Sequence, residues 1–360
     1  MEGVRLRGFL AVVFGLVVLF VVACSPPGAN TGGGSGGGSS EEVEQKVAEE
    51  TGGETAEACD LQPPEGLDSI EDAVVGFSQS EKEVNPFRIA ETESVRSEAK
   101  KRGVKEFLYT NAQSQQPKQI SDIRDMIAQD VDIIIASSLA SEGFEPALEA
   151  AKEAGVPIFL IDREIEAEPC EDYVTVMHSD FLEQGRMAGE AMIEATGGEA
   201  NIAILEGDPG TSASQERTDG FVEVVEQEAN MEVVASQPAN FVRTEGQEVM
   251  EQLIQANPDI DAVYAANDEM ALGALQALRD AGKTPGEDVQ IVSIDGTRGA
   301  VQGIIDGEIA AVIETNPRFG PLAFDQIEKF LAGEPVPPQI IVQDRVFDES
   351  NAEQVIDEAY

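Results

Sequence analysis

The sequence contains no tryptophan, one histidine, three cysteines, and only 23 Lys and Arg residues against 69 Asp and Glu residues. With His178 as the single histidine, a multi-histidine metal site is excluded, and a serine–histidine–aspartate triad would have no second histidine as a base. We expect His178 at a crossover between domains. The formal net charge of −46 argues against nucleic acid as a partner, since phosphates require cations. We therefore expect no cofactor, no metal and a monomer.

The acidity belongs mainly to the part of the chain that folds. Only seven of the acidic residues fall in Glu41–Glu57. The same charge argues against electrostatic docking on anionic lipid. We hypothesise that the acidic surface is an adaptation to a saline medium, where salt screens the repulsion between like charges. An acidic surface with another cause is the alternative.

Long apolar runs are scarce, and the clearest one lies near the start of the chain, at Gly8–Val22. Arg5 and Arg7 precede it, and it ends in Ala23-Cys24, the pattern of an export signal. The run resembles a bacterial lipoprotein signal, in which residues 1–24 end at Cys24, the lipidated first residue of the mature protein. An uncleaved anchor is the alternative and leaves the topology unchanged. Both predict an exported, anchored protein, at the outer side of the cytoplasmic membrane or in the periplasm.

Residues 25–68 follow as a segment rich in Gly, Ser and Glu that is too polar to form a core. We predict a flexible tether here, which joins the lipid anchor to the folded region. Cys59 and Cys170 are the remaining cysteines, and in an exported protein two such residues often pair. Both precede predicted strands, which would place them at the amino-terminal edge of one parallel sheet. We predict a disulfide between them.

The remaining 300 or so residues alternate strand patterns with amphipathic helix patterns, which predicts parallel sheets covered by helices on both faces. Two series of five strands predict two doubly wound α/β domains. The first takes residues 69–179 plus 318–336, including the helix Phe319–Leu331, and the second takes 180–317 plus 337–360. Three crossovers join them, near 177–180, 315–317 and 335–338. The ten predicted strands are Ala73–Phe77, Lys105–Thr110, Val131–Ala136, Pro157–Ile161, Tyr173–Met177, Asn201–Leu205, Glu232–Gln237, Ala262–Ala265, Gln290–Ile294 and Ala310–Glu314.

The stretch Pro157–Arg163 gives the first indication of a site. Its apolar residues predict a strand buried on both faces, and its carboxyl end carries Asp162 and Arg163. Ligands of open parallel sheets lie beyond the carboxyl ends of strands. A carboxylate beside a guanidinium there accepts and donates hydrogen bonds to one polyhydroxylated ligand. The alternative is a local ion pair that ends the strand.

Further polar and aromatic residues fall at the same ends of other predicted strands. Each has a structural alternative: Asp268 as a helix cap, Asp295 as part of a turn, Phe87 and Phe241 as core, and Arg217 as a solvated helix residue. Their common position favours one cleft that binds vicinal hydroxyls, with aromatic rings against the C–H face of a sugar. The candidates from strand and helix ends are Ser78, Phe87, Arg88, Asp162, Arg163, Arg217, Phe241, Asn267 and Asp295.

The chain, from about Val74 to its end, resembles the type I periplasmic sugar-binding proteins of the ribose- and galactose-binding class. Within that class it is most similar to the galactofuranose binders of ABC importers. The resemblance is specific for the family because several motifs occur in order. They are Phe87-Arg88-Ile89-Ala90-Glu91-Thr92, Phe159-Leu160-Ile161-Asp162-Arg163, Arg217-Thr218-Asp219-Gly220-Phe221, Asn240-Phe241-Val242-Arg243-Thr244-Glu245-Gly246, Ala266-Asn267-Asp268-Glu269-Met270-Ala271 and Ser293-Ile294-Asp295-Gly296.

The resemblance implies that Arg88, Asp162, Arg163, Arg217, Asn267 and Asp295 hydrogen-bond a sugar, and that Phe87 and Phe241 contact its ring. In the galactofuranose binders the position that corresponds to Phe87 looks like tryptophan, and this chain contains no tryptophan. Glu314 is similar to them, whereas ribose binders carry a glutamine nearby.

We therefore predict a lipid-anchored solute-binding protein that captures a monosaccharide, a galactofuranose-like hexose or a pentose, and delivers it to an ABC permease. A tethered sensor for a chemoreceptor or kinase is the main alternative. A glycoside hydrolase that uses Asp162, Asp268 and Asp295 is a weaker alternative, and it would turn over a glycoside. Repressors of the lactose-repressor family share the fold, but they begin with a helix-turn-helix where this chain has an export signal.

Overall fold

The computed structural model describes residues 47–51 and 61–360, which all fall in one compact unit spanning 42–360. The predicted signal 1–24, with Cys24, and the predicted disulfide partner Cys59 lie outside the described residues. Cys170 is disulfide-bonded. No helix among the described residues is both long and apolar enough to cross a membrane.

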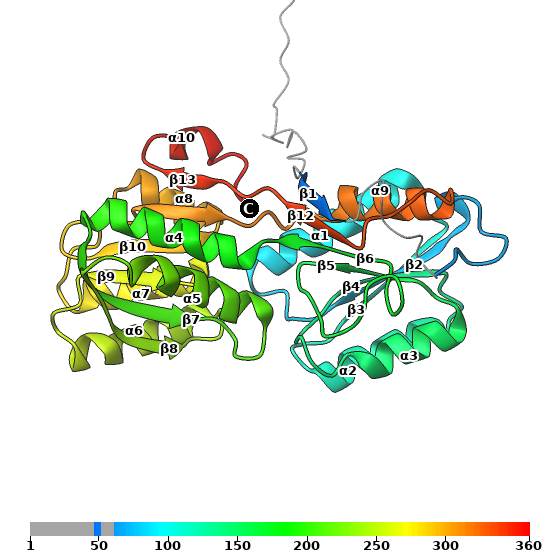
Figure 1. The fold of residues 1–360 in the computed structure, drawn as a ribbon, viewed down its shortest axis with the longest axis horizontal. Coiled ribbons are helices and arrows are strands. Elements are labelled where there is room, and N and C mark those ends of the chain that lie inside the picture. Colours follow the sequence, from blue (N-terminus) through cyan, green and yellow to red (C-terminus); the bar gives the residue numbers. More distant parts are fainter. Residues whose placement is uncertain (1–46, 52–60) are drawn as a thin grey trace, which may run out of the picture. The chain divides into compact units, whose positions relative to one another are not determined.

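The first sheet has seven strands in the order β1-β12-β6-β5-β4-β2-β3 (Figure 1). Its pairs are parallel except for β1 with β12, which is antiparallel. The strands are β1 (Val47–Thr51), β2 (Val74–Gln79), β3 (Glu106–Asn111), β4 (Ile133–Ser137), β5 (Ile158–Ile161), β6 (Thr175–Ser179) and β12 (Gln339–Val342).

Helices between these strands cover both faces of the first sheet. Each begins or ends with a residue suited to that position: Asn85 caps the first turn of α1 with its side chain, Pro86 follows it, and Gly103 ends the helix in the left-handed conformation. These elements and the first sheet form the first lobe. The helices are η1 (Ile70–Asp72), α1 (Pro86–Arg102), α2 (Gln116–Ile127), α3 (Glu145–Ala154) and α9 (Gly320–Leu331).

The second sheet has six strands in the order β13-β11-β10-β9-β7-β8, parallel except for β13. With its helices it forms the second lobe. Its strands are β7 (Glu199–Glu206), β8 (Asn230–Pro238), β9 (Ala262–Ala265), β10 (Gln290–Asp295), β11 (Ala311–Glu314) and β13 (Val346–Asp348). Its helices are α4 (Phe181–Thr196), α5 (Ser212–Val225), α6 (Arg243–Ala256), α7 (Asp268–Asp280), α8 (Arg298–Ile305) and α10 (Ala352–Val355).

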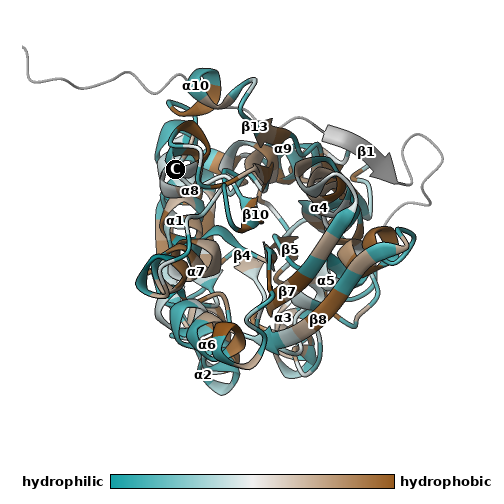
Figure 2. Ribbon diagram, turned by 90° about the vertical axis from the view of Figure 1, so that its left-hand side faces the viewer, coloured by the Kyte–Doolittle hydropathy of each residue, from teal (hydrophilic) through white to brown (hydrophobic). Residues whose placement is uncertain are grey.

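The predicted fold class, two doubly wound α/β domains, is confirmed. Central strands of both sheets are buried along their whole length, as their near-continuous apolar sequences require. Two clusters of buried side chains cover the two faces of the first sheet, and one large cluster fills the second lobe. Figure 2 shows the apolar colour on β5, with hydrophilic colour on outer helices such as α2 and α6.

Three segments cross between the lobes, after β6, after β11 and after β12 (Figure 1). The first two lie where the sequence predicted them. The third lies later than predicted: residues 339–342 were assigned to the second domain but form β12, which pairs with β6 of the first sheet. The chain enters the second sheet only at β13. The prolines of Pro335–Pro338 indicated a boundary, but they precede an edge strand instead.

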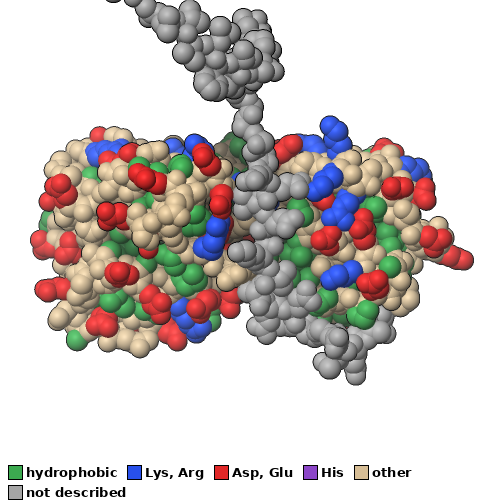
Figure 3. Space-filling view, turned by 90° about the horizontal axis from the view of Figure 1, so that it is seen from above, with side chains coloured by type: hydrophobic (Ala, Val, Ile, Leu, Met, Phe, Trp, Pro, Cys, Tyr) green, Lys and Arg blue, Asp and Glu red, His purple; other side chains and the backbone are tan. Residues whose placement is uncertain are grey.

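The predicted flexible tether also contains a strand. Residues 47–51 form β1 and pair with β12, so the segment 25–68 is not wholly irregular. Strand addition at a sheet edge uses backbone N–H and C=O groups, which composition does not reveal. Around both lobes, acidic side chains are scattered over the face shown in Figure 3 and outnumber the basic ones.

Candidate functional site

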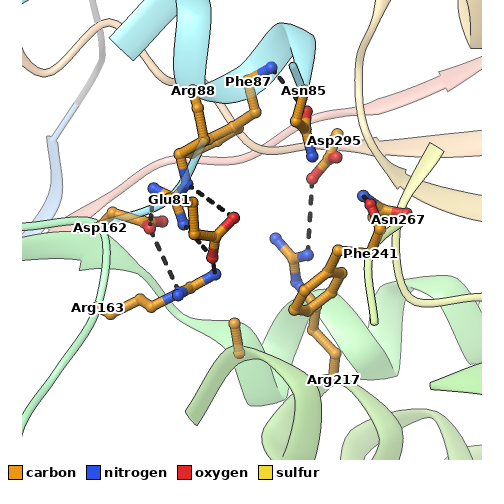
Figure 4. A pocket seen from close by; sticks show the side chains of 11 residues that line it. Glu81, Asn85, Phe87, Arg88, Asp162, Arg163, Arg217, Phe241, Asn267 and Asp295 are labelled. Carbon is orange, nitrogen blue, oxygen red and sulfur yellow. Dashed lines mark hydrogen bonds and ion pairs between the residues drawn. The ribbon is translucent and has the colours of Figure 1, made fainter. Parts of the chain in front are cut away.

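A pocket lies where strand ends of both sheets meet, and its lining residues come from both lobes (Figure 4). It is strongly polar, because long charged side chains line it. Most of these residues follow β2, β5, β9 or β10, or lie in the first turns of α1 and α5. The lining residues are Glu81, Asn85, Phe87, Arg88, Asp162, Arg163, Ala213, Arg217, Phe241, Asn267 and Asp295.

Arg88 is the centre of the first-lobe half of the pocket. Its Nη1 donates to Asp162 Oδ2 at 2.6 Å and to Glu91 Oε2 at 2.9 Å, with both carboxylates buried. Burial and the nearby charge of Asp162 raise the pKa of Glu91 to about 7, although Arg88 opposes that shift. Asp162 has a left-handed φ of 70°, a strained conformation that is common at functional sites. Protein contacts therefore hold the side chains of Arg88 and Asp162 in place.

Arg163 and Glu81 form the second ion pair of this lobe. Arg163 Nη2 donates to Glu81 Oε1 at 2.5 Å, and Arg88 Nε lies 3.4 Å from the other Glu81 oxygen. Burial alone would raise the pKa of Glu81, but the charges of Arg163 and Arg88 lower it to about 2. The buried Nε of Arg163 makes no hydrogen bond to the described residues. Glu81 thus neutralises guanidinium groups that still have donor capacity for a ligand.

The second lobe supplies Arg217 and Asp295, whose Nη1 and Oδ1 lie 3.6 Å apart. Asp295 ends β10, and burial raises its pKa well above the usual range against the opposing charge of Arg217. The turn after it is held by Asp268, which accepts hydrogen bonds from Gly296 N at 2.9 Å and Thr297 N at 2.7 Å. Asn267, not Asp268, caps α7, by accepting a bond from Met270 N. Asp268 therefore does not line the pocket but holds the turn that follows Asp295.

Two aromatic rings border the polar groups. Phe87 is 5% exposed and packs edge-on against Tyr360, so it belongs to both core and pocket. Phe241 has a left-handed φ of 58° and stands against Gly207, where an added Cβ would lie 2.0 Å from the ring. Glycine at position 207 is what allows this ring to reach the pocket.

All the predicted ligand residues except Ser78 and Glu314 line this pocket; their contact with a sugar stays a prediction. Ser78 is fully buried within β2 and accepts from Gln119 Nε2 at 3.3 Å. Glu314 is bound by Arg345, through bonds of 2.5 and 2.7 Å. Ser78 was predicted from its position near a strand end, but a residue one position before the end of a strand points into a sheet face. Glu314 was predicted from the resemblance, and its side chain turns towards Arg345 in the crossover after β12.

Sequence analysis missed Glu81, Asn85 and Ala213. Glu81 and Asn85 lie in the loop between β2 and α1, where no periodicity singles out one residue. The Asn85-Pro86 pair does mark a helix start, which is the one signal that was available. His178 lies at the end of β6, next to the first crossover, as predicted, and contacts Glu164 at 3.2 Å. No group of three or more potential metal ligands gathers among the described residues.

The chain matches the model of one protein family and is similar in sequence to known binding proteins. The model of the "periplasmic binding protein domain" family matches residues 75–335. The chain is 38% identical over 260 residues to the galactofuranose-binding protein YtfQ of Escherichia coli (strain K12), covering 71% of this chain and 81% of that one. It is 38% identical over 285 residues to the ribose import binding protein RbsB of Bacillus subtilis (strain 168), covering 78% and 90%.

Among solved structures, a Mycobacterium smegmatis protein in complex with β-D-fucofuranose superposes with a TM-score of 0.75. It is 38% identical, and the match covers 79% of this chain and 93% of that chain. The two relatives from Escherichia coli and Bacillus subtilis are named as binding proteins. The prediction of a non-enzymatic binding protein is therefore confirmed, and so is the resemblance on which it was based.

Proposed function

Because the chain belongs to the periplasmic binding protein family, we propose that it captures a neutral furanose sugar, a galactofuranose-like hexose or a pentose, between its lobes and delivers it to an ABC permease. One observation carries the proposal: a buried set of guanidinium and carboxylate groups, contributed by both lobes, converges on one pocket. A ligand held from both sides favours the closed arrangement of the lobes, because only that arrangement makes all its contacts.

The pocket offers both hydrogen-bond donors and acceptors to a ligand. Its lining has three guanidinium groups (Arg88, Arg163, Arg217) and three carboxyl groups (Glu81, Asp162, Asp295). Vicinal hydroxyls of a neutral sugar accept from the guanidinium groups and donate to the carboxyl oxygens.

The charged side chains that line the pocket indicate how the sugar enters. They come from both lobes, so we expect the lobes to separate and these side chains to rearrange when a sugar binds. Glu81 is the group that must move, since its carboxylate now occupies the donors of Arg163 and Arg88. The sugar hydroxyls then replace Glu81 at part of these donors. Phe87 and Phe241 are placed to cover the C–H face of the ring.

The furanose form is supported by two relatives, one named for galactofuranose and one solved with β-D-fucofuranose. The ribose import relative keeps pentoses among the candidates. The proposal has three further parts. They are lipid attachment at Cys24, a disulfide between Cys59 and Cys170, and a tether that leads to the first lobe. The tether would keep the protein near the membrane in which the permease lies.

Isothermal titration tests this function. The panel contains galactose, fucose, arabinose, ribose, glucose and inositol, in high salt. We expect tight one-to-one binding, without turnover, of a sugar that forms a furanose. Asp162→Ala and Asp295→Ala should each weaken binding by about 1.5–3 kcal/mol, as loss of a charged hydrogen-bonding partner does.

The exposed Asp125→Ala in α2 is the matched control and should bind like the wild type. If the folded protein binds no sugar of the panel, the result would contradict the furanose proposal and favour the sensor alternative with another ligand. Near-native affinity in both pocket variants would place the sugar elsewhere.

A further inference from the structure

One buried amide contacts two of the three crossovers between the lobes directly, and reaches the first through Asp344. Gln184, in the first turns of α4, is fully buried. Its Nε2 donates to Thr315 Oγ1 at 2.8 Å, and Thr315 lies in the second crossover, directly after β11. The same Nε2 donates to Asp344 Oδ2 at 2.8 Å, and Asp344 lies in the third crossover, between β12 and β13.

Asp344 extends the contact to the first crossover. Its Oδ1 accepts a hydrogen bond of 3.0 Å from Ser179 Oγ, at the end of β6. Ser179 ends β6 and Asp344 follows β12, both strands of the first sheet, whereas Gln184 and Thr315 belong to the second lobe. The Gln184–Asp344 bond therefore joins the two lobes. A change in crossover backbone angles that moves the lobes apart must change this bond.

The other end of the Gln184 amide holds a pocket residue. Arg217 Nε donates to Gln184 Oε1 at 2.9 Å, and Arg217 Nη2 donates to Thr315 Oγ1 at 2.8 Å. A third bond, from Nη1 to Ala266 O at 2.9 Å, completes the support of the guanidinium. The amide can satisfy Arg217 with its oxygen and Asp344 with its nitrogen in only one orientation. The carboxylate of Asp344 thus fixes the orientation in which Gln184 receives Arg217.

We propose that Gln184 and Asp344 are positioning residues, which hold Arg217 in its sugar-binding pose only while the three crossovers keep the arrangement seen here. The inference rests on the proposed function of the pocket. It adds a route by which sugar contact at Arg217 is coupled to the relative position of the lobes. Coupling through one hydrogen-bonded chain is reciprocal, so closure also strengthens the hold on Arg217.

The charge of Asp344 matters because few charged groups surround it. Glu314, which is paired with Arg345, faces it from β11, and Arg217 faces it from α5. Burial, opposed by the bonds from Gln184 and Ser179, raises the pKa of Asp344 to about 7. A carboxylate at position 184 would lie directly against the carboxylate of Asp344. Two adjacent carboxylates cannot both ionise without strong repulsion.

The first experiment measures sugar affinity by titration calorimetry on the full chain. Gln184→Leu removes both the donor and the acceptor, and we expect roughly a tenfold to hundredfold weaker affinity, with the charged bond to Arg217 lost. Gln326→Leu is the control, because Gln326 is almost as buried but lies in α9 of the first lobe. It should leave affinity unchanged. Equal affinity of Gln184→Leu and wild type, even with lowered thermal stability, would overturn the proposal.

The second experiment is a pH profile of Gln184→Glu. Its carboxylate still accepts from Arg217, but it faces Asp344 where the amide nitrogen stood. At about pH 5.5 the two carboxylates share a proton and binding should approach that of the wild type. At about pH 8 the ratio of the variant's Kd to the wild-type Kd should be larger by about tenfold. A ratio that does not change with pH contradicts the role of Asp344, since a purely structural defect would persist at both values.

The third experiment needs no sugar. Amide hydrogen exchange of Gln184→Leu should become faster in residues 178–181, 314–317 and 343–345, and stay as in wild type in the cores of both sheets. Unchanged exchange at the crossovers would overturn the proposal whatever the ligand is. A wild type that binds no furanose would instead refute the proposed function, and this third measurement then decides on the positioning residues alone.

Discussion

At the scale of single residues, Arg88 contacts two carboxylates, Glu81 in the pocket and Glu91 behind it, whose pKa values shift in opposite directions. Glu81 faces both Arg163 and Arg88, and its pKa falls to about 2. Glu91 shares Arg88 with Asp162, and burial together with that second negative charge raises its pKa to about 7. The Oε1 of Glu91 is buried and has no hydrogen-bond partner among the described residues. Of these two carboxylates, Glu91 is therefore the one that is stabilised by taking up a proton.

Replacing Glu91 with glutamine should change how stability depends on pH. The folded pKa of about 7 exceeds the ordinary 4.5, so the folded state holds the proton more tightly and this stabilisation is lost as pH rises from 4.5 to 7. The wild type should lose up to about 3 kcal/mol of unfolding free energy in that window from this group, and Glu91→Gln should not. Urea unfolding at several pH values measures the difference.

The exposed Glu93→Gln, on the same helix, is the control and should follow the wild-type curve. Parallel curves for the wild type and Glu91→Gln would show that Glu91 does not carry the proton.

At the scale of secondary-structure elements, the close approach of α4 and α5 places Arg217. Gly185 of α4 lies against the backbone of α5, where an added Cβ would be 2.3 Å from Arg217 O. Gly220 of α5 faces the backbone of α4 in the same way, with Leu182 O at 2.1 Å from an added Cβ. Two glycines thus let the helices touch at backbone distance, as the crossing of tightly packed helices requires.

Gly185→Ala should push α5 away from α4, because a Cβ at 2.3 Å from a backbone oxygen cannot be accommodated without a shift of the helix. We expect a loss of about 1–3 kcal/mol in unfolding free energy, together with weaker sugar binding as Arg217 moves. Thermal unfolding and titration calorimetry measure the two effects. Glu190→Ala, at an exposed position of the same helix, is the control. Unchanged stability in Gly185→Ala would contradict this account of the packing.

At the scale of the whole molecule, charge is the dominant feature. The excess of acidic groups amounts to 69 − 23 = 46 negative charges. The described surface ion pairs use only part of these carboxylates, and Figure 3 shows many more spread over the visible face. Repulsion between them acts on the folded state most strongly when little salt is present.

Stability should therefore fall when salt is removed. We expect the midpoint of thermal unfolding to drop markedly between molar and millimolar sodium chloride, because the screening length grows from about 3 Å at 1 M to about 30 Å at 0.01 M. Scanning calorimetry across this range measures it, with sucrose at matched osmolality as the control for non-ionic effects. A midpoint independent of salt would refute the saline-adaptation hypothesis.

The fold class and much of the pocket could be predicted from the amino-acid sequence. Buried parallel strands need continuous apolar runs, and those runs end abruptly, so Asp162, Asn267 and Asp295 were recognisable as residues at strand ends. Alternation of these runs with amphipathic helices left few other architectures possible.

Only the tertiary structure decided the rest, because it depends on backbone pairing and on contacts distant in sequence. The pairing of β1 and β12 uses backbone groups that carry no side-chain pattern. Glu81 enters the pocket through a loop without periodicity, while Glu314 turns to Arg345, 31 positions away. In the sequence, nothing distinguishes Gln184 from other polar residues of a predicted helix. It joins Arg217 to the crossovers only because α4, α5 and the segment after β12 meet in space.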